Sequence, residues 1–116
     1  MDGILRALDG RFLRPAPGHI GLIAEVEGGP IGFAPALLQP GTWSPKPLCY
    51  LEDLFVREEA RGADAGRALI EALAERGRAE GWRRLYWQTA RGNETAQRLY
   101  DNVARRTDWL RYDLDL

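Results

Sequence analysis

Residues 50–66, with the sequence YLEDLFVREEARGADAG, constrain the fold of this chain more than any other stretch. They begin with an apolar run that has aromatic and β-branched members and a length typical of a buried strand. A charged segment, residues 57–59, ends that run. Small residues then precede residues 67–73, RALIEAL, which have the composition and spacing of a helix. The stretch therefore predicts a strand, a turn and a helix in succession.

The start of this predicted helix is also a candidate phosphate site. Small residues let backbone N–H groups approach an anion, and the helix dipole favours negative charge at that end. Most glycine-bearing turns of this kind only connect two elements. The residues alone therefore leave two interpretations open, a phosphate cradle and a plain connection.

The segments before residue 50 predict a β-hairpin. Apolar runs over residues 19–27 and 31–38 flank a Gly-Gly-Pro turn. Pro35 predicts a bulge or an edge position in the second of these strands. Residues 1–18 are mixed in character. Their apolar members predict a partial helical segment that stops near Gly10: Ile4, Leu5, Ala7 and Leu8.

The segments after the turn predict two helices and two strands. A helix over residues 65–80 ends at Gly81, and a strand over residues 84–89 follows, which implies a parallel crossover. Asn93 can cap a second helix. Residues 107–116 alternate and predict a last strand. The apolar stripe of the second helix repeats at helical spacing: Ala96, Leu99, Tyr100 and Val103.

Size and composition exclude several classes of protein. A chain of 116 residues predicts a single domain, residues 1–116, with one modest core. A net charge of −1 argues against general nucleic-acid binding through a basic surface. Cys49 is the one cysteine, which excludes an internal disulfide and a multi-cysteine metal site. No apolar run is long enough to span a membrane and no secretory signal is visible, so we expect a cytoplasmic protein.

The order of these motifs resembles the GNAT N-acetyltransferase superfamily. The motifs are an antiparallel hairpin, YLEDLFV, RGxxxG opening a helix, YWQT and NxxAxxLY. YLEDLFV followed by the arginine–glycine turn is similar to the diamine (spermidine/spermine) acetyltransferase-like branch. The resemblance runs from about His19 to the end of the chain. It implies a mixed α/β fold with a twisted sheet flanked by helices. It also implies that acetyl-CoA binds where two neighbouring parallel strands splay apart.

The resemblance assigns the central stretch to acetyl-CoA. The pyrophosphate needs N–H donors, which a helix start supplies, and the pantetheine arm can pair with strand backbone like an added strand. A plain strand–turn–helix crossover remains the alternative, and for Asn93 the alternative is a simple cap. The candidate cofactor residues are Leu54, Phe55, Val56, Arg61, Gly62, Ala63, Asp64, Ala65, Gly66, Arg67 and Asn93.

Asp64 departs from the family turn, which usually reads R-G-x-G-x-G/A. A carboxylate at this point would repel the pyrophosphate, and a side chain would stand where close backbone approach matters. Aspartate also caps helices well and tolerates left-handed backbone, so the turn is still expected to form. Arg61 and Arg67 would offset its charge. We therefore expect the substitution to weaken cofactor binding and to leave the fold intact.

Tyr100 is the candidate general acid that the resemblance implies. Acetyl transfer expels a CoA thiolate, and a phenol near that sulfur can donate a proton. The alternative is that Tyr100 only belongs to the apolar stripe of its helix.

Glu52 and Asp53 are candidate catalytic carboxylates. Adjacent side chains in a strand point to opposite faces unless a bulge intervenes. An amine acceptor must lose a proton before attack, and the resemblance makes Glu52 the stronger candidate base and Asp53 the weaker one. A structural ion pair with an arginine is the alternative role for both.

Only 18 residues precede His19, which is short for this family. We therefore expect the first strand and helix of the fold to be missing or incomplete. The sheet edge left open would favour pairing with a second copy, so a homodimer is expected.

The combined prediction is acetyl transfer from acetyl-CoA to a primary amine of a small molecule, without a metal. Two alternatives remain. One is a catalytically weak or inactive CoA-binding domain, and the other is a structural or oligomerising module.

Overall fold

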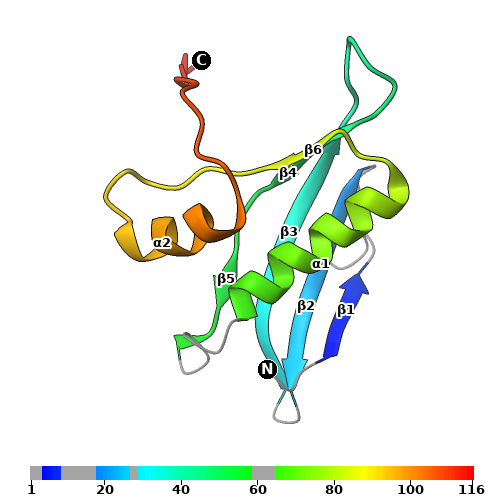
Figure 1. Cartoon of the computed structure of the whole chain (residues 1–116), viewed down its shortest axis with the longest axis vertical. Coiled ribbons are helices and arrows are strands. Elements are labelled where there is room, and N and C mark those ends of the chain that lie inside the picture. The colour runs from blue at the N-terminus through cyan, green and yellow to red at the C-terminus, as the bar shows by residue number, and fades with distance from the viewer. Residues whose placement is uncertain (1–3, 9–17, 27–28, 59–64) are drawn as a thin grey trace.

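The computed structural model describes residues 4–8, 18–26, 29–58 and 65–116. Strands dominate the first half of the chain and helices the second half (Figure 1). The elements in chain order are β1 (Ile4–Leu8), β2 (His19–Val26), β3 (Gly29–Gln39), β4 (Leu48–Leu51), β5 (Phe55–Val56), α1 (Ala65–Glu80), β6 (Arg84–Tyr86) and α2 (Glu94–Val103).

The strands form one mixed sheet in the order β1-β2-β3-β4-β6, with β5 paired to β3. Neighbours from β1 to β4 are antiparallel, whereas β4 and β6 are parallel, with Tyr50 opposite Tyr86. Because α1 connects β4 and β5 to β6, the predicted strand–helix–strand crossover is confirmed. β6 ends at Tyr86 and the chain then turns away from the line of β4 and β5 (Figure 1). The mixed α/β fold class is confirmed.

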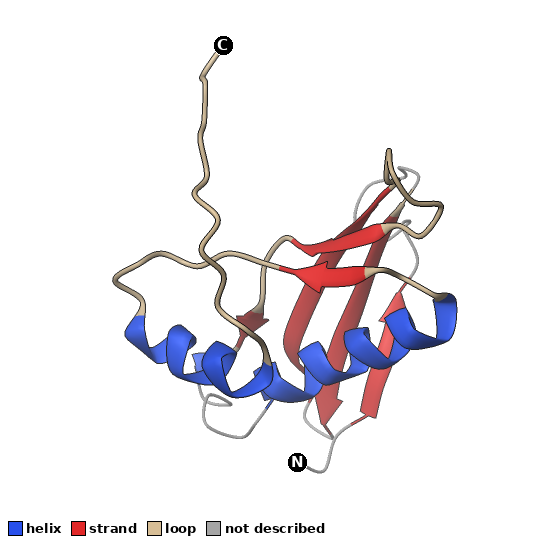
Figure 2. Cartoon of the chain, turned by 45° about the horizontal axis from the view of Figure 1, so that its top comes forward, coloured by secondary structure: helices blue, strands red, loops and turns tan. Residues whose placement is uncertain are grey.

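Helix α1 covers one face of the sheet, and its inward side chains complete a core to which the strands contribute the larger share (Figure 2). Leu69 and Leu73 are completely buried, and Ile70 is nearly so. The strands beneath them present small side chains, so the helix can approach closely. A Cβ added at Gly32 of β3 would come within 3.0 Å of the Leu69 Cδ1 atom. The prediction that α1 spans residues 65–80 and ends at Gly81 is also confirmed, since Gly81 has a φ of 80°.

The irregularity predicted at Pro35 lies in the strand opposite it. The backbone N–H of Glu52 donates to the Pro35 carbonyl at 2.9 Å, but proline has no N–H to return the bond. The ladder breaks there. Ala36 of β3 pairs with Leu51, whereas Phe33 pairs with Phe55. Between these two pairs, the chain that forms β4 and β5 advances by one residue more than β3. This extra residue is a β-bulge between β4 and β5.

The helix predicted near the N-terminus is wrong. Ile4–Leu8 form β1, which pairs antiparallel with β2 from Ile4 opposite Glu25 to Leu8 opposite Gly21. A segment of 5 residues is too short to hold a helix by itself, whereas the ladder with β2 satisfies its backbone groups. The first strand of the fold is therefore present, contrary to the expectation that it would be missing. Residues 9–17 lie outside the described residues.

The last predicted strand, residues 107–116, is also not formed. This tail is extended and exposed, and its end stands away from the body of the molecule (Figures 1 and 2). A strand needs a paired neighbour, and the tail has no strand beside it among the described residues. No helix in the described part of the chain is both long enough and apolar enough to cross a membrane.

Candidate functional site

A bulge lies between β4 and β5, so strand alternation does not decide where Glu52 and Asp53 point, and the two candidate carboxylates have different partners. The Glu52 Oε1 atom lies 3.6 Å from the His19 Nε2 atom at the start of β2. The Asp53 Oδ1 atom accepts a hydrogen bond from the Leu54 N–H at 2.8 Å, and the negative charge of Asp53 acts on Tyr100. Each carboxylate thus has its own surroundings. His19, which the sequence indicated only as a strand-start residue, is part of this region.

Tyr100 lies half-buried on the inward face of α2. Burial, and then the charge of Asp53, raises the pKa of its phenol above the ordinary value of 10.0. Its ring meets the Trp87 ring edge-on, with centroids 5.4 Å apart and planes at 66°. The phenol is therefore protonated at neutral pH and held in a defined orientation, as a proton donor must be.

The residues predicted for the cofactor divide into three groups. Leu54, Phe55 and Val56 lie at the bulge and in β5, next to the start of α1. Ala65 and Gly66 open α1 and are buried. Arg61, Gly62, Ala63 and Asp64 lie outside the described residues.

Gly66 has a packing role that the sequence did not indicate. A Cβ at this position would lie 3.3 Å from the Leu99 Cδ2 atom and 3.4 Å from the Leu54 Cδ2 atom. Glycine therefore lets α1, α2 and the bulge approach one another. The first turn of α1, which begins at Ala65, contains no acidic residue.

Arg67 and Asn93 already have partners within their own elements. The Arg67 Nε atom lies 3.1 Å from the Glu71 Oε1 atom, in an exposed pair one helical turn apart. The Asn93 Oδ1 atom accepts a hydrogen bond from the Ala96 N–H at 3.2 Å, so Asn93 caps α2 as predicted.

Two tyrosines join strand ends on the sheet face opposite Cys49. The rings of Tyr50 and Tyr86 lie 5.0 Å apart. The Tyr86 hydroxyl donates to the Gln39 Oε1 atom at 2.6 Å, and the Gln88 Nε2 atom donates to the Tyr50 hydroxyl at 3.3 Å. These contacts hold β3, β4 and β6 together. Because neighbouring residues of a strand face opposite sides of a sheet, the position of Tyr50 next to Cys49 could have indicated the face on which these tyrosines lie.

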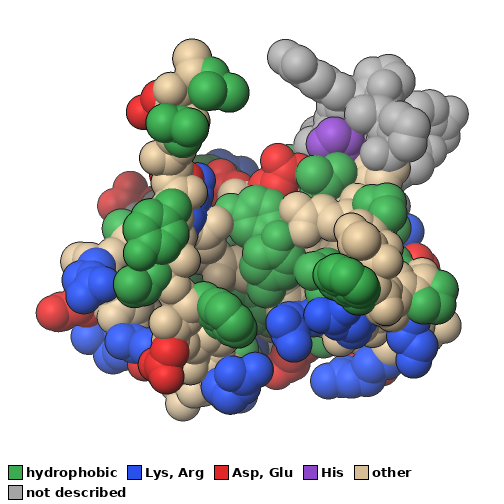
Figure 3. All heavy atoms as spheres, turned by 90° about the horizontal axis from the view of Figure 1, so that it is seen from above, with side chains coloured by type: hydrophobic (Ala, Val, Ile, Leu, Met, Phe, Trp, Pro, Cys, Tyr) green, Lys and Arg blue, Asp and Glu red, His purple; other side chains and the backbone are tan. Residues whose placement is uncertain are grey.

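A groove of about 900 Å³ runs along the outer edge of β6, between that strand, α2 and the beginning of the tail. Of the predicted site residues, Tyr100 lines this groove, whereas the bulge and the start of α1 do not. Figure 3 shows hydrophobic side chains gathered in the middle of one face with Lys and Arg side chains beside them. The residues that line the groove include Leu85, Trp87, Arg84, Arg91, Arg105 and Trp109.

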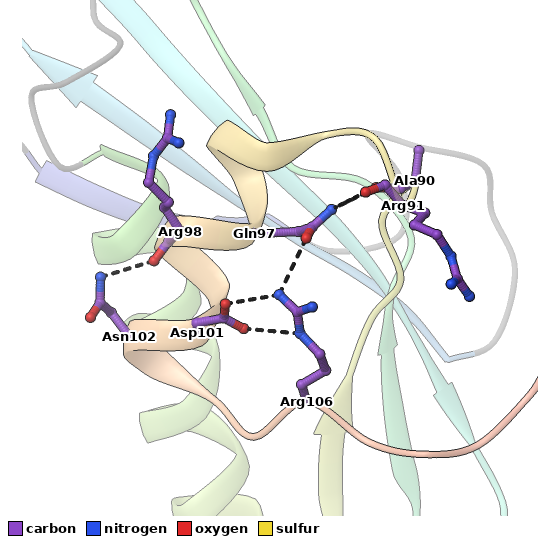
Figure 4. Close-up of polar contacts among 7 residues, drawn as sticks. All are labelled: Ala90, Arg91, Gln97, Arg98, Asp101, Asn102 and Arg106. Carbon is purple, nitrogen blue, oxygen red and sulfur yellow. Dashed lines mark hydrogen bonds and ion pairs between the residues drawn. The ribbon is translucent and has the colours of Figure 1, made fainter.

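The outer side of α2 is tied to the segments on either side of it (Figure 4). Gln97 donates to the carbonyl oxygens of Ala90 and Arg91 at 3.1 and 2.6 Å. The Arg106 Nη2 atom donates to Asp101 Oδ2 at 2.8 Å and to Gln97 Oε1 at 3.2 Å. These contacts fix α2, and hence Tyr100, relative to the strand before it.

No group of three or more His, Cys, Asp and Glu side chains in the described ranges is placed to hold a metal ion.

Comparison with known proteins gives one family. The sequence model of the acetyltransferase (GNAT) family matches residues 2–103. The D-amino-acid N-acetyltransferase HPA3 of Saccharomyces cerevisiae is 38% identical over 104 residues, which cover 88% of this chain and 65% of that protein. The thialysine N-epsilon-acetyltransferase of Caenorhabditis elegans is 31% identical over 100 residues, covering 82% and 62%. The chain thus spans slightly less than two thirds of the length of these relatives.

A solved structure agrees with the fold. An aminoglycoside acetyltransferase from an uncultured soil metagenomic sample superposes with a TM-score of 0.87, covering 100% of this chain and 99% of that one. The two sequences are 23% identical, so this likeness concerns the fold.

Proposed function

We propose, because this chain belongs to the acetyltransferase (GNAT) family, that it transfers the acetyl group of acetyl-CoA to a primary amine of a small molecule. The observation that carries the proposal is the position of Tyr100. Its protonated, half-buried phenol lies within reach of the Asp53 charge, beside the bulge to which the family resemblance assigns the reaction.

For acetyl-CoA we assign the pyrophosphate to the start of α1 and the pantetheine arm to the backbone of residues 54–56. The absence of acidic side chains in the first turn of α1 supports the first assignment. The assignment of Arg61, Gly62, Ala63 and Asp64 rests on the sequence motif alone. Because of the Asp64 carboxylate, we expect cofactor affinity below that of a glycine-containing turn.

The proposed reaction needs a base for the acceptor amine and an acid for the departing sulfur. The acceptor nitrogen bonds to the acetyl carbon, its N–H proton passes to a carboxylate, and the carbon–sulfur bond breaks. Tyr100 donates its hydroxyl proton to the departing sulfur and regains a proton from water. We assign Glu52 as the base, with His19 beside it at 3.6 Å, and keep Asp53 as the alternative base.

For the acceptor we propose an amine of an amino acid or of a diamine. The two relatives are named for a D-amino acid and for thialysine, and the motif YLEDLFV is similar to the diamine-acetyltransferase-like branch. All of these acceptors present an aliphatic ammonium group, and Glu52 supplies an exposed carboxylate to receive it.

The test combines binding with turnover. Calorimetry should detect acetyl-CoA binding, and thiol release should be measured with D-amino acids, thialysine and spermidine. Tyr100→Phe should leave cofactor binding nearly unchanged and lower the catalytic rate by roughly 10²-fold, the size expected for loss of a general acid. Binding without turnover in the parental protein would instead identify an inactive CoA-binding domain.

The matched control is Tyr86→Phe, which removes a hydroxyl from the other group of tyrosines and spares the proposed donor. It should reduce stability by about 1 kcal/mol through its lost hydrogen bond and leave the rate close to parental. Glu52→Gln and Asp53→Asn then separate the two carboxylates. If Tyr100→Phe turns over as fast as the control, the phenol is not the acid.

A further inference from the structure

His19 is the one histidine of the chain, and the strand pairing fixes its place in the sheet. It begins β2 and lies opposite Leu37 of β3, which in turn lies opposite Tyr50 of β4. Opposed residues of paired antiparallel strands point to the same face of a sheet. His19 therefore lies on the sheet face opposite Cys49, on the same side as Tyr50.

The backbone just before His19 is held close to β3. The Leu38 N–H donates to the Gly18 carbonyl oxygen at 2.9 Å, and Gly18 has a φ of 84°. A Cβ at Gly18 would lie 3.1 Å from the Leu38 carbonyl oxygen. Both the left-handed backbone and this close approach favour glycine. The position of the imidazole is thus set by the sheet on one side and by the Gly18 contact on the other.

The imidazole and the Glu52 carboxylate meet across an intervening strand. β3 lies between β2 and β4, and strands two places apart in a sheet are separated by about 9–10 Å. Both side chains must therefore lean over β3 to bring the His19 Nε2 atom within 3.6 Å of the Glu52 Oε1 atom. This distance is slightly longer than a hydrogen bond, as catalytic pairs often are before the substrate binds.

The second imidazole nitrogen decides which proton His19 carries. The Nδ1 atom is buried and has no hydrogen-bond partner among the described residues. A proton on Nδ1, in the imidazolium or in the Nδ1–H tautomer, would be a buried N–H without an acceptor, which proteins tolerate less often than an unpaired acceptor. In the Nδ1–H tautomer, moreover, a bare Nε2 atom would face the Glu52 carboxylate. The Nε2–H tautomer avoids both costs.

The same geometry separates the roles of the two side chains. With Nδ1 buried, Nε2 is the imidazole nitrogen that can act, and in the Nε2–H tautomer it is a donor without a free lone pair for the proton of an amine. The Glu52 side chain is 40% exposed, against 26% for His19. The carboxylate is therefore the group that meets a ligand, and the imidazole acts on the carboxylate.

We propose that His19 is a positioning residue, whose neutral Nε2–H holds the Glu52 Oε1 atom and leaves Oε2 for the ammonium group of the acceptor. A glutamate side chain loses rotamer freedom when it is held in one orientation, and a base that is already oriented avoids that loss during the reaction. This role rests on the proposed function of Glu52 as the base. The tautomer and the contact do not, and both are measured on the protein without ligands.

Nitrogen-15 NMR of the free, tag-free protein tests the tautomer and the contact. With one histidine, the imidazole signals identify themselves. At about pH 8, above the ordinary imidazole range, we expect the Nε2–H tautomer alone, with an Nε2–H proton that exchanges slowly enough to be seen. Glu52→Ala should remove that proton signal, because water replaces the acceptor, whereas the matched control Asp53→Ala should keep it. An Nδ1–H population, or a proton signal that persists in Glu52→Ala, would overturn the proposal.

The kinetic test uses two amides of different length at position 19. Glutamine can place its amide Nε2 near the position of the imidazole Nε2, so His19→Gln should keep kcat/KM for the amine within about threefold of parental. The shorter amide of His19→Asn does not reach Glu52, and kcat/KM should fall by roughly tenfold or more, the size of a hydrogen bond to a charged group. The affinity for acetyl-CoA should be alike in the two variants, which separates positioning of the base from general damage to the fold.

A double-mutant cycle shows whether His19 acts through Glu52. In a Glu52→Gln background, His19→Asn should cost no further activity, because residues that act as a unit are not additive. Fully additive losses, or equal losses in His19→Gln and His19→Asn, would contradict the positioning role. A parental protein without turnover would count against the proposed acetyl transfer instead, and the NMR measurement would still decide whether His19 holds Glu52.

Discussion

The two helices, α1 and α2, pack against the same core to very different depths. Leu69, Ile70 and Leu73 of α1 are at most 3% exposed, whereas no residue of α2 is fully buried. α1 is held by apolar burial. α2 is held by a half-buried stripe, by the Asn93 cap and by the Gln97 and Arg106 contacts. The difference fits the roles proposed for them, because α2 carries Tyr100, the proposed general acid, and a side chain that must reach a ligand cannot be fully enclosed.

The same substitution in each helix should give the largest effect and the clearest contrast. Leu69→Ala should lower the free energy of unfolding by about 2–5 kcal/mol, because it leaves a cavity at a fully buried site. Leu99→Ala, at a half-buried site in α2, should cost about half as much. Urea unfolding of both variants measures the difference. Equal losses would show that α2 contributes to the core as fully as α1.

The titration of two side chains, Cys49 in the core and Tyr100 in α2, should show the same contrast as a function of pH. Burial raises the pKa of the Cys49 thiol to about 12, from an ordinary value of 9.0. The folded state therefore holds this proton more tightly than the unfolded state. The resulting stability is complete below pH 9 and is lost as the pH rises toward 12. Cys49→Ala should have a flatter loss of stability over that range, measured by urea unfolding at each pH.

Tyr100 should titrate without unfolding, since it is only half-buried. Its raised pKa should fall back toward 10.0 in Asp53→Asn, because the repelling charge is removed. Ultraviolet absorbance of the phenolate follows this, with Tyr100→Phe as the blank. A thiol reagent applied to the native protein should leave Cys49 unmodified under the same conditions. An unchanged tyrosine titration in Asp53→Asn would remove the electrostatic link between bulge and helix.

The smallest expected effect concerns the start of α2. Asn93→Ala should cost about 1 kcal/mol of stability, because the Ala96 N–H loses its side-chain acceptor. Asn102→Ala is the control. It removes an exposed amide that donates to the Arg98 carbonyl within the same helix, and we expect a change within about 0.5 kcal/mol. Circular dichroism during thermal unfolding compares the two. A control as costly as Asn93→Ala would mean that the cap has no special role.

Sequence patterns predicted the parts of the fold that depend on neighbouring residues. α1 was predicted with its observed bounds because helical spacing and the stop at Gly81 are both local signals. β1 was missed because a 5-residue apolar segment has no diagnostic period, and its partner β2 follows only after a further segment. The tail shows the converse. Its alternation predicts a strand, yet alternation cannot supply the strand that must lie beside it.

The candidate site was predictable to a similar extent. Pro35 predicted an irregularity, and the bulge opposite it removes the alternation by which Glu52 and Asp53 would have pointed to opposite faces. The closeness of Asp53 to Tyr100, and of His19 to Glu52, depends on segments far apart in the chain, which no local pattern encodes.

The bulge opposite Pro35 also shifts the alternation of inward-facing and outward-facing side chains along the strand by one residue. Cys49 and Leu51 face the core, so strict alternation would turn Asp53 and Phe55 inward. The extra residue of the bulge changes which of the following side chains face inward. Leu54 and Val56 lie against the α1 start at Gly66, and Phe55 is 53% exposed. The bulge thus decides which side chains of the YLEDLFV motif are exposed, namely Glu52, Asp53 and Phe55. Adding or removing one residue in this strand would move its acids to the other face of the sheet without changing the acids themselves.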